Sequence, residues 1–188
     1  MANTASNVTA GKPKTGGAIY IAPLDTELPE NTTDSLTGFT CLGYVSEDGV
    51  ANDNSPESDS VKAWGGDTVL TLQTDRPDSF TFTLLEVLDA DVLKVIYGDS
   101  NVTEESNGDI SVKATSEALV GHAWVIDMIV RDGRAKRIVI PNGTVSSVST
   151  ITYSDTAAVG YGVTVTDVPD EDGVYHYEYI SGESEISG

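Results

Sequence analysis

Residues 122–140 read HAWVIDMIVRDGRAKRIVI, and this stretch decides the fold class. Between His122 and Arg131 both sets of alternating positions are mostly apolar, which predicts a strand that is covered on both of its faces. Asp132-Gly133 then carries the sequence signal of a tight hairpin turn, and the apolar run Ala135–Ile140 follows it. The stretch therefore predicts an antiparallel β-hairpin that forms the most buried part of the chain.

Outward from this hairpin, most apolar residues alternate or form short runs bounded by Gly, Pro, Asn and Asp, which is typical of strands. The clearest further alternation predicts a second hairpin, in which Thr74–Asp78 joins two neighbouring strands. Asn142-Gly143 is expected to be another turn. The strands expected outside the first hairpin are Ala18–Ala22, Phe39–Val45, Asp67–Gln73, Ser79–Leu85, Ile110–Ala114, Thr144–Tyr153, Val159–Asp167 and Val174–Ile180.

One segment, Ala90–Tyr97, has the pattern of a short helix. Asp89 is placed to cap its first turn, and Gly98 is a residue type that ends helices. Its apolar side chains form a single stripe, enough to dock the helix on a sheet. We therefore expect a mainly β fold: an antiparallel β-sandwich or barrel-like domain with one short α-helix at about 90–97.

The sequence predicts that the chain has three parts. Residues 1–17 are polar and small and predict a flexible N-terminal arm. Residues 18–180 form a single domain, and 181–188 are a C-terminal tail. Within the domain, Ser46–Gly66 is rich in acids, has no strong periodicity and ends on a tryptophan. Because so long a connection is uncommon in a compact domain, this loop is expected to be functional.

Composition excludes several classes of partner. The 188 residues include 30 acids and 10 bases, which gives a formal net charge of −20. A chain this acidic is not suited to holding duplex DNA or an anionic membrane through clustered lysines and arginines. The N-terminal residues lack the features of a signal peptide, and no apolar run is long enough for a membrane span. These features predict an acidic protein made in a cytoplasm.

No motif in the chain points to catalysis. His122 and His176 stand outside any metal-ligand spacing, and each is expected to be a satisfied core or interface histidine. The acidic runs 53–59 and 170–173 do not match a calcium-loop pattern. There is no nucleophile elbow and no phosphate-binding loop. We therefore expect no enzymatic activity, no cofactor and no metal.

The charge pattern carries more information than any motif. Four of the ten bases lie within seven residues, at Arg131, Arg134, Lys136 and Arg137, and only acids follow them. One interpretation is a solvated hairpin. The other is self-association, in which this basic hairpin meets the acidic loop of a neighbouring copy. The second interpretation gives a set of candidate inter-subunit residues: Glu47, Asp48, Asp53, Glu57, Asp59, Lys62, Trp64, Arg131, Arg134, Lys136 and Arg137.

Several strings, in this order along the chain, resemble the major tail tube proteins of long-tailed, non-contractile (siphovirus-type) bacteriophages. They are Gly43-Tyr44-Val45-Ser46-Glu47-Asp48-Gly49, Asn54-Ser55-Pro56-Glu57, Lys62-Ala63-Trp64-Gly65-Gly66-Asp67, Asp91-Val92-Leu93-Lys94, Tyr97-Gly98-Asp99, Trp124-Val125-Ile126-Asp127 and Arg137-Ile138-Val139-Ile140-Pro141. They span nearly the whole chain, and their collinear order makes the resemblance specific.

The resemblance implies a structural virion protein. In that family six subunits form a ring, rings stack into a tube, and the genome passes through the lumen without sequence-specific contact. It implies that the long acidic loop reaches neighbouring subunits. It further implies a tape measure protein and tail terminator and tip proteins as partners, assembly from the bacterial host cytoplasm, no membrane contact and no enzymatic activity.

Two expectations remain beside it. The alternative function is a secreted β-sandwich module that binds carbohydrate or cell wall, with Tyr175, Tyr177 and Tyr179 as its aromatic face. For a tube, the acid excess and strand faces that carry hydroxyls, such as Thr81 and Thr83, predict a net-negative lumen with few inward-pointing bases. Duplex DNA, itself strongly negative, would slide through such a lumen without binding.

Overall fold

The computed structural model describes residues 3–182, which form thirteen β-strands, one α-helix and three short 3₁₀ turns. The main sheet has nine strands and is antiparallel throughout. Its strands are β1 (Lys12–Pro13), β2 (Ile19–Ala22), β3 (Thr40–Cys41), β4 (Val45–Asp53), β7 (Ser79–Leu84), β10 (His122–Ile129), β11 (Ala135–Val148), β12 (Tyr161–Asp167) and β13 (Tyr177–Ile180). Two smaller hairpins pair β5 (Glu57–Lys62) with β6 (Thr68–Asp75) and β8 (Val102–Glu104) with β9 (Ile110–Val112).

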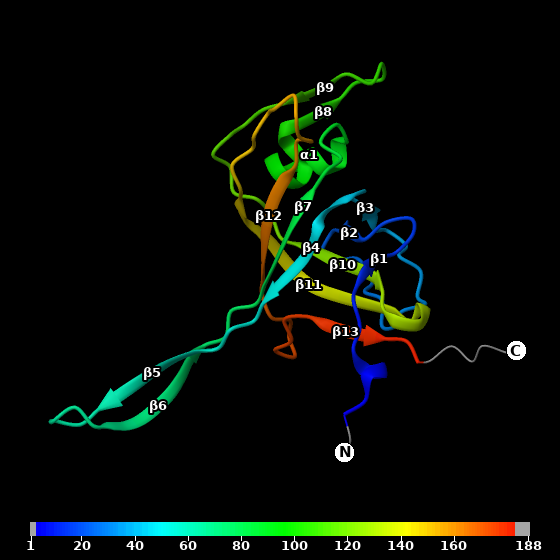
Figure 1. Ribbon diagram of the computed structural model, residues 1–188. Helices are drawn as coiled ribbons and strands as arrows, with labels where there is room; N and C mark the ends of the chain where they lie inside the picture. Colours follow the sequence, from blue (N-terminus) through cyan, green and yellow to red (C-terminus); the bar gives the residue numbers. More distant parts are fainter. Residues whose placement is uncertain (1–2, 183–188) are drawn as a thin grey trace, which may run out of the picture.

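Strand β11 joins the two halves of the main sheet. Its first part pairs with β10 and β13, and its second part pairs with β12, which continues through β7 to β4. The register shifts between Val145 and Ser147, and such a bulge bends a strand. The sheet therefore curves over itself (Figure 1). Its outermost strands, β3 and β4, do not pair with each other within residues 3–182, so the fold is sandwich-like and not a closed barrel.

The core lies between these two halves and under helix α1 (Ala90–Tyr97). Trp124 and Ile126 of β10 face Phe80 and Phe82 of β7, and all four side chains are at most 3% exposed. Each such side chain contributes roughly 1.5–3 kcal/mol through burial. The indole of Trp124 meets the ring of Phe82 edge-on, with centroids 5.9 Å apart. The predicted central hairpin and the mainly β fold class are thus confirmed.

The predicted helix is also confirmed. Its N-cap is Asp89, whose carboxylate accepts hydrogen bonds from the backbone N–H groups of Asp91 and Val92. Gly98 follows with φ of 90°, a conformation that residues with a Cβ rarely adopt. Five of its eight residues are buried, and they close one end of the sandwich.

The outer face of β10 is covered as well, by a loop that Arg137 holds in place. Ala123, Val125 and Asp127 point to this side and are buried. Arg137, only 2% exposed, donates from Nε and Nη2 to both Asp127 oxygens at 2.6 and 2.8 Å. Its Nη1 donates to the carbonyl oxygens of Asn31 and Asp34, which fastens residues 24–38 over the sheet.

The predicted turn at Asn142-Gly143 is wrong, because β11 runs through it without interruption. Gly143 pairs with His122 on one side and Asp167 on the other. A Cβ at this position would lie 2.6 Å from Val165 Cγ1 and 3.0 Å from Trp124 Cδ1. Glycine is present here because the core packs directly against the backbone, and the Gly143 carbonyl accepts the Trp124 Nε1–H at 2.9 Å.

The predicted hairpin of Asp67–Gln73 with Ser79–Leu85 is wrong too, and Ser46–Gly66 consists mostly of strands where a long loop was predicted. Residues 45–84 instead form one long hairpin with two sections: β4 pairs with β7 beside the core, and β5 pairs with β6 beyond it. The loop has no apolar period because β5 and most of β4 are exposed, so that the usual sign of a strand is missing. The predicted strand Phe39–Val45 shortens to β3. Lys12 and Pro13, which lie in the predicted N-terminal arm, pair with β10.

Candidate functional site

The section β5–β6 forms an arm that projects from the body of the molecule (Figure 1). We use "arm" for residues 57–75. Every residue of both strands is exposed. The hydrogen-bonded register runs from the Glu57–Asp75 pair to the Lys62–Thr68 pair, and the tip carries Trp64 with a fully exposed side chain. An isolated two-stranded hairpin is marginally stable in water, so an arm whose strand residues are all exposed is a candidate contact surface.

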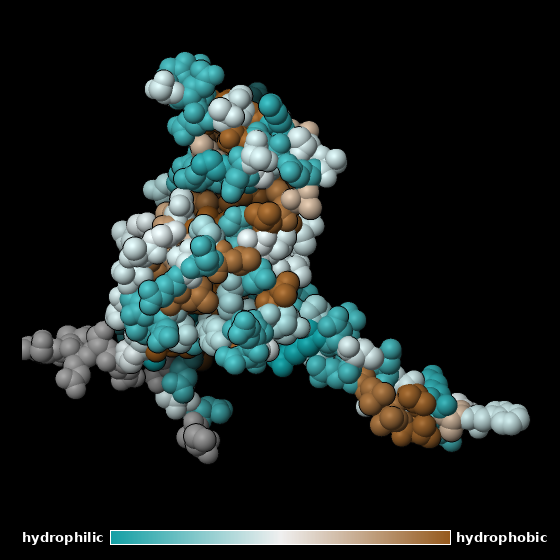
Figure 2. Space-filling model, turned by 180° about the vertical axis from the view of Figure 1, so that it is seen from behind, coloured by the Kyte–Doolittle hydropathy of each residue, from teal (hydrophilic) through white to brown (hydrophobic). Residues whose placement is uncertain are grey.

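The arm has an apolar patch near its tip, which we define as Val61, Leu70 and Leu72 together with Val69. Val61 pairs with Leu70 across the strands, and Leu72 lies two residues further along the same face. Each of the four side chains is 47–61% exposed. Figure 2 shows them gathered at the end of the projection, separated from other apolar surface by polar residues. Contiguous exposed apolar residues of this kind mark a protein contact surface.

The opposite face of the arm is polar. Ser58 pairs with Gln73 and Ser60 with Thr71, whose hydroxyl oxygens lie 3.4 Å apart. The two faces of the arm therefore differ in chemistry. The sequence analysis assigned Leu70 and Leu72 to a hairpin of the body. β6 alternates as cleanly as β7, and the signal that could have placed it on the arm is the acid-rich segment that became its partner strand β5.

The residues predicted in the acidic loop lie on both sections of the long hairpin. Glu47, Asp48 and Asp53 are on β4, and Glu57, Asp59 and Lys62 are on β5. Within residues 3–182 none of these six side chains takes part in an ion pair. Together with Trp64 we call these residues the acidic strip. All seven are exposed, and they lie on two strands and a turn and not on the predicted loop.

The four predicted basic residues do not form one free patch. Arg137 is buried against Asp127, so its side chain is not available for a contact with another subunit. Lys136 pairs with Glu178 at 2.8 Å, and Arg134 Nε donates to the Ser181 carbonyl oxygen at 2.8 Å. Arg131 donates to the Ala5 carbonyl oxygen and remains half-exposed. The turn that carries Arg131 and Arg134 lies across the body from the arm (Figure 1). Within one chain this turn is therefore far from the acidic residues of β5.

Arg137 also controls the ionisation of its partner. Burial by itself raises the pKa of the Asp127 carboxyl, but hydrogen bonds and charge from Arg137 and Lys14 outweigh burial and hold this pKa below 3.8. The Lys14 ammonium lies 3.1 Å from Asp127 Oδ2. Asp127 is therefore a structural carboxylate that ties the N-terminal arm, β10 and β11 together.

A second surface of interest is the outer side of β7, β12 and the end of β11. Alternate residues here carry hydroxyls while their neighbours fill the core: Thr164 pairs with Thr81, and Val163 pairs with Phe82. We call this surface the hydroxyl face and define it as Ser79, Thr81, Thr83, Ser146, Thr164 and Thr166. Two pairs of its hydroxyls bond to each other, with 2.7 Å between Thr166 and Ser146 and 3.3 Å between Thr81 and Thr164. Neither β4, β7, β12 nor residues 144–148 contain a lysine or arginine.

The histidines and the C-terminal tyrosines have local partners. His122 Nδ1 lies 3.1 Å from the Val120 carbonyl oxygen, and His176 pairs with Asp78. Tyr177 and Tyr179 stack in parallel at 6.3 Å, and the Tyr177 hydroxyl donates to Asp170 Oδ2 at 2.7 Å. Both rings are partly covered. Within residues 3–182, β13 therefore has no row of fully exposed aromatic side chains.

Comparison with known proteins agrees with this geometry. A family model described as phage tail tube protein matches residues 1–187. No curated protein matches the chain. In the part of the chain that the structure describes, no helix has the length and apolar character needed to cross a membrane.

Proposed function

Because this chain belongs to the phage tail tube protein family, and so is a structural component of the virion tail, we propose how its surfaces build the tube. Six copies form a ring, and rings stack into the tube of a long, non-contractile tail. The genome travels through the lumen into the host cell. The protein acts without catalysis and is made in the host cytoplasm before assembly. The tape measure protein and the tail terminator and tip proteins are its further partners.

The exposed apolar patch of the arm is the observation that supports this proposal. Val61, Leu70 and Leu72 remain about half-exposed, and the arm extends well beyond the body. A head-to-tail contact, in which the arm of each copy packs on the body of the next, generates rings and filaments. The patch would be buried in that contact, and the acidic strip with Trp64 would lie along the same interface.

Charge favours the same direction of contact. Within residues 3–182 the acids of β4 and β5 form no ion pair, whereas the partly exposed bases Arg131, Arg134 and Lys136 lie on the far side of the body. A neighbour placed head-to-tail would bring these opposite charges closer than they are within one chain. Each exposed pair contributes only about 0–1 kcal/mol, so charge selects the orientation while apolar burial supplies most of the affinity.

The hydroxyl face is the surface we assign to the lumen. It is neutral, two pairs of its hydroxyls bond to each other, and neither β7, β12 nor residues 144–148 carry a base. A bore lined by lysines or arginines would bind DNA phosphates at every ring. The hydroxyl face provides a wall along which a duplex slides.

Electron microscopy of the purified protein tests the proposal. The wild-type chain should form rings or tubes. The double variant Leu70→Ser/Leu72→Ser should stay folded, because both side chains are already exposed, and should lose tube formation. A matched control, Ser60→Thr/Thr71→Ser, exchanges two hydroxyl side chains on the polar face and should assemble like wild type. Normal tubes from the Leu variant, or a wild type that stays monomeric under all conditions tested, would overturn the proposal.

A further inference from the structure

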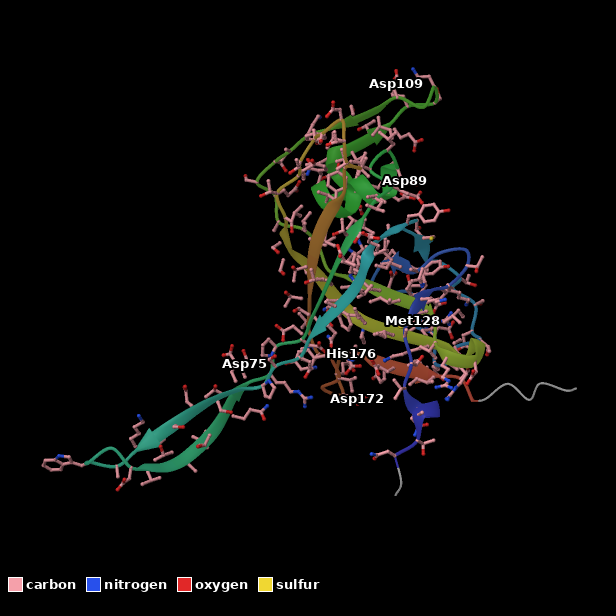
Figure 3. The ribbon with its side chains drawn as sticks, in the orientation of Figure 1. Asp75, Asp89, Asp109, Met128, Asp172 and His176 are labelled. Atoms are coloured by element: carbon pink, nitrogen blue, oxygen red, sulfur yellow. The ribbon has the colours of Figure 1, made fainter. Side chains whose placement is uncertain are left out.

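Three side chains that are far apart in the sequence meet at the root of the arm. Asp78 directly precedes β7, Asp167 ends β12, and His176 directly precedes β13. One ligand atom from each lies within 4.8 Å of the other two. Figure 3 labels His176 at this place, where the long hairpin leaves the body. Because the three residues come from three distant segments, no spacing in the sequence could reveal them.

The two carboxyl groups of the cluster are buried, and one of them is unpaired within residues 3–182. Asp78 is 0% exposed and Asp167 is 4% exposed. His176 Nδ1 lies 2.5 Å from Asp78 Oδ2, so one carboxylate has a partner. Within residues 3–182 Asp167 has none: both of its carboxyl oxygens are buried without a hydrogen bond. An unpaired buried carboxylate is costly, and native proteins seldom keep one without a cation, a proton or a ligand beside it.

The groups around the cluster hold its ligand atoms in place. Asn52 Nδ2 donates to Asp78 Oδ1 at 2.6 Å, which leaves Oδ2 directed at the cluster. The Asp167 N–H donates to the Asp78 carbonyl oxygen at 3.0 Å and fixes the two backbones side by side. The His176 ring rests edge-on against Phe80, with centroids 5.2 Å apart. Outer contacts of this kind orient the ligands of metal sites.

We propose that Asp78, Asp167 and His176 bind one divalent transition-metal ion of the Zn²⁺ class. One imidazole nitrogen and two carboxylate oxygens are ligands that Zn²⁺ takes at about 2.0–2.2 Å. In a tetrahedral site ligands of that bond length lie about 3.3 Å apart, so small side-chain movements suffice. Two carboxylates and a neutral imidazole also balance the ion's charge. The imidazole favours Zn²⁺ over Ca²⁺ and Mg²⁺, which prefer oxygen ligands alone.

The proton is the natural competitor for this site. Burial, with the charge of Asp78 adding to it, raises the pKa of Asp167 to about 8. A metal ion binds only the ionised carboxylate, so its binding releases the proton held there. The bound ion would fasten three segments to one another: the root of the arm, the end of β12 and the C-terminal segment before β13. This site is independent of the proposed function, since a single chain contains all of its ligands.

The test uses the full chain, stripped of metal and kept unassembled, with Zn²⁺ as the probe in isothermal titration calorimetry. The wild type should bind one Zn²⁺ per chain, and Zn²⁺ should raise its unfolding temperature. Co²⁺ in the same site should give visible absorption bands of a low-symmetry nitrogen and oxygen site. Asp167→Asn replaces the carboxylate with a neutral amide of nearly the same shape at a side chain that makes no hydrogen bond within residues 3–182, so this variant should fold normally. It should weaken Zn²⁺ binding at least about tenfold, the lower end of what changes around metal ligands cause.

Two further variants make the result decisive. His176→Gln should weaken Zn²⁺ binding to a similar extent. Asp172→Asn removes the same charge from an exposed turn nearby and should leave binding unchanged. The proposal is overturned if wild type binds no Zn²⁺, or if Asp172→Asn lowers affinity as much as Asp167→Asn does, since that shows adventitious binding to surface acids. It is also overturned if Ca²⁺ or Mg²⁺ binds more tightly than Zn²⁺. Because the readout is ion binding by one chain, its failure is distinguishable from a failure to form tubes.

Discussion

Arg137 is the residue on which the packing of the outer face of β10 depends. Its guanidinium makes a bidentate contact with Asp127 and two bonds to carbonyl oxygens of the 24–38 loop, all from a side chain that is 2% exposed. The planar fork of arginine fits this set of acceptors, and the single ammonium of lysine does not. The sequence showed four neighbouring bases and could not show which of them turns inward.

The first prediction concerns this residue. Arg137→Met should lower the free energy of unfolding by about 3–5 kcal/mol, because it leaves Asp127 as a buried charge without its main partner. Arg137→Lys should recover only part of the loss. Arg131→Met, at a half-exposed position of the same hairpin, should cost at most about 1 kcal/mol. Urea unfolding of the unassembled chain measures all three, and equal losses at positions 131 and 137 would contradict this role.

The second prediction concerns acid. The pKa of Asp127 is lower in the folded chain than its ordinary value of 3.8. Its contribution to stability is therefore fully present above pH 3.8 and is lost as the pH falls through the folded pKa. Carboxyl-carbon NMR should show Asp127 titrating below 3.8, with unfolding easier at each lower pH. A titration at or above 3.8 would mean that burial outweighs the two cations.

At the scale of elements, the sequence predicted buried segments well and exposed ones poorly. β10 and α1 were correctly predicted because core packing places apolar residues on both faces of β10 and along one stripe of α1, and Asp132-Gly133 marked the turn by its residue types. β5 carries no such period, since both of its faces meet solvent in one chain, and its strand was missed. The partner of the strand that carries Leu70 and Leu72 was misassigned for a different reason: alternation indicates a strand but does not indicate which strand it pairs with.

The third prediction concerns β11 and its glycine. Gly143→Ala should destabilise the chain by about 1–3 kcal/mol, because the new methyl group would press on Val165 and Trp124 in a packed core. Gly182→Ala, where nothing lies within 4 Å of the added carbon, should change stability little. Thermal unfolding followed by Trp fluorescence would report both. An unchanged midpoint for Gly143→Ala would mean that the strand can shift to accept the methyl group.

At the scale of the whole molecule, two unlike surfaces point in different directions. The arm carries an apolar patch that one chain leaves exposed, and the hydroxyl face is polar, neutral and internally bonded. Such a division suits a subunit that binds its own copies on one surface and binds nothing on another. The net charge of −20 supports the second property, because it opposes adhesion to DNA.

The fourth prediction concerns that property. Assembled tubes should not retain short duplex DNA, at low salt or at high salt. Thr81→Lys places a base on the hydroxyl face, and its tubes should retain DNA with an affinity that falls steeply as salt rises. Asn107→Lys adds the same charge on the exposed β8–β9 connection and should have little effect. DNA retention by wild-type tubes, or equal retention by the two variants, would contradict the assignment of the lumen.

A cryo-electron microscopy structure of the assembled tube tests the account most directly. We expect Val61, Leu70 and Leu72 of each arm to be buried against the neighbouring copy, and Thr81 and Thr164 to line the bore. A tube in which the arms project freely into solvent, or in which arginines ring the bore, would contradict it.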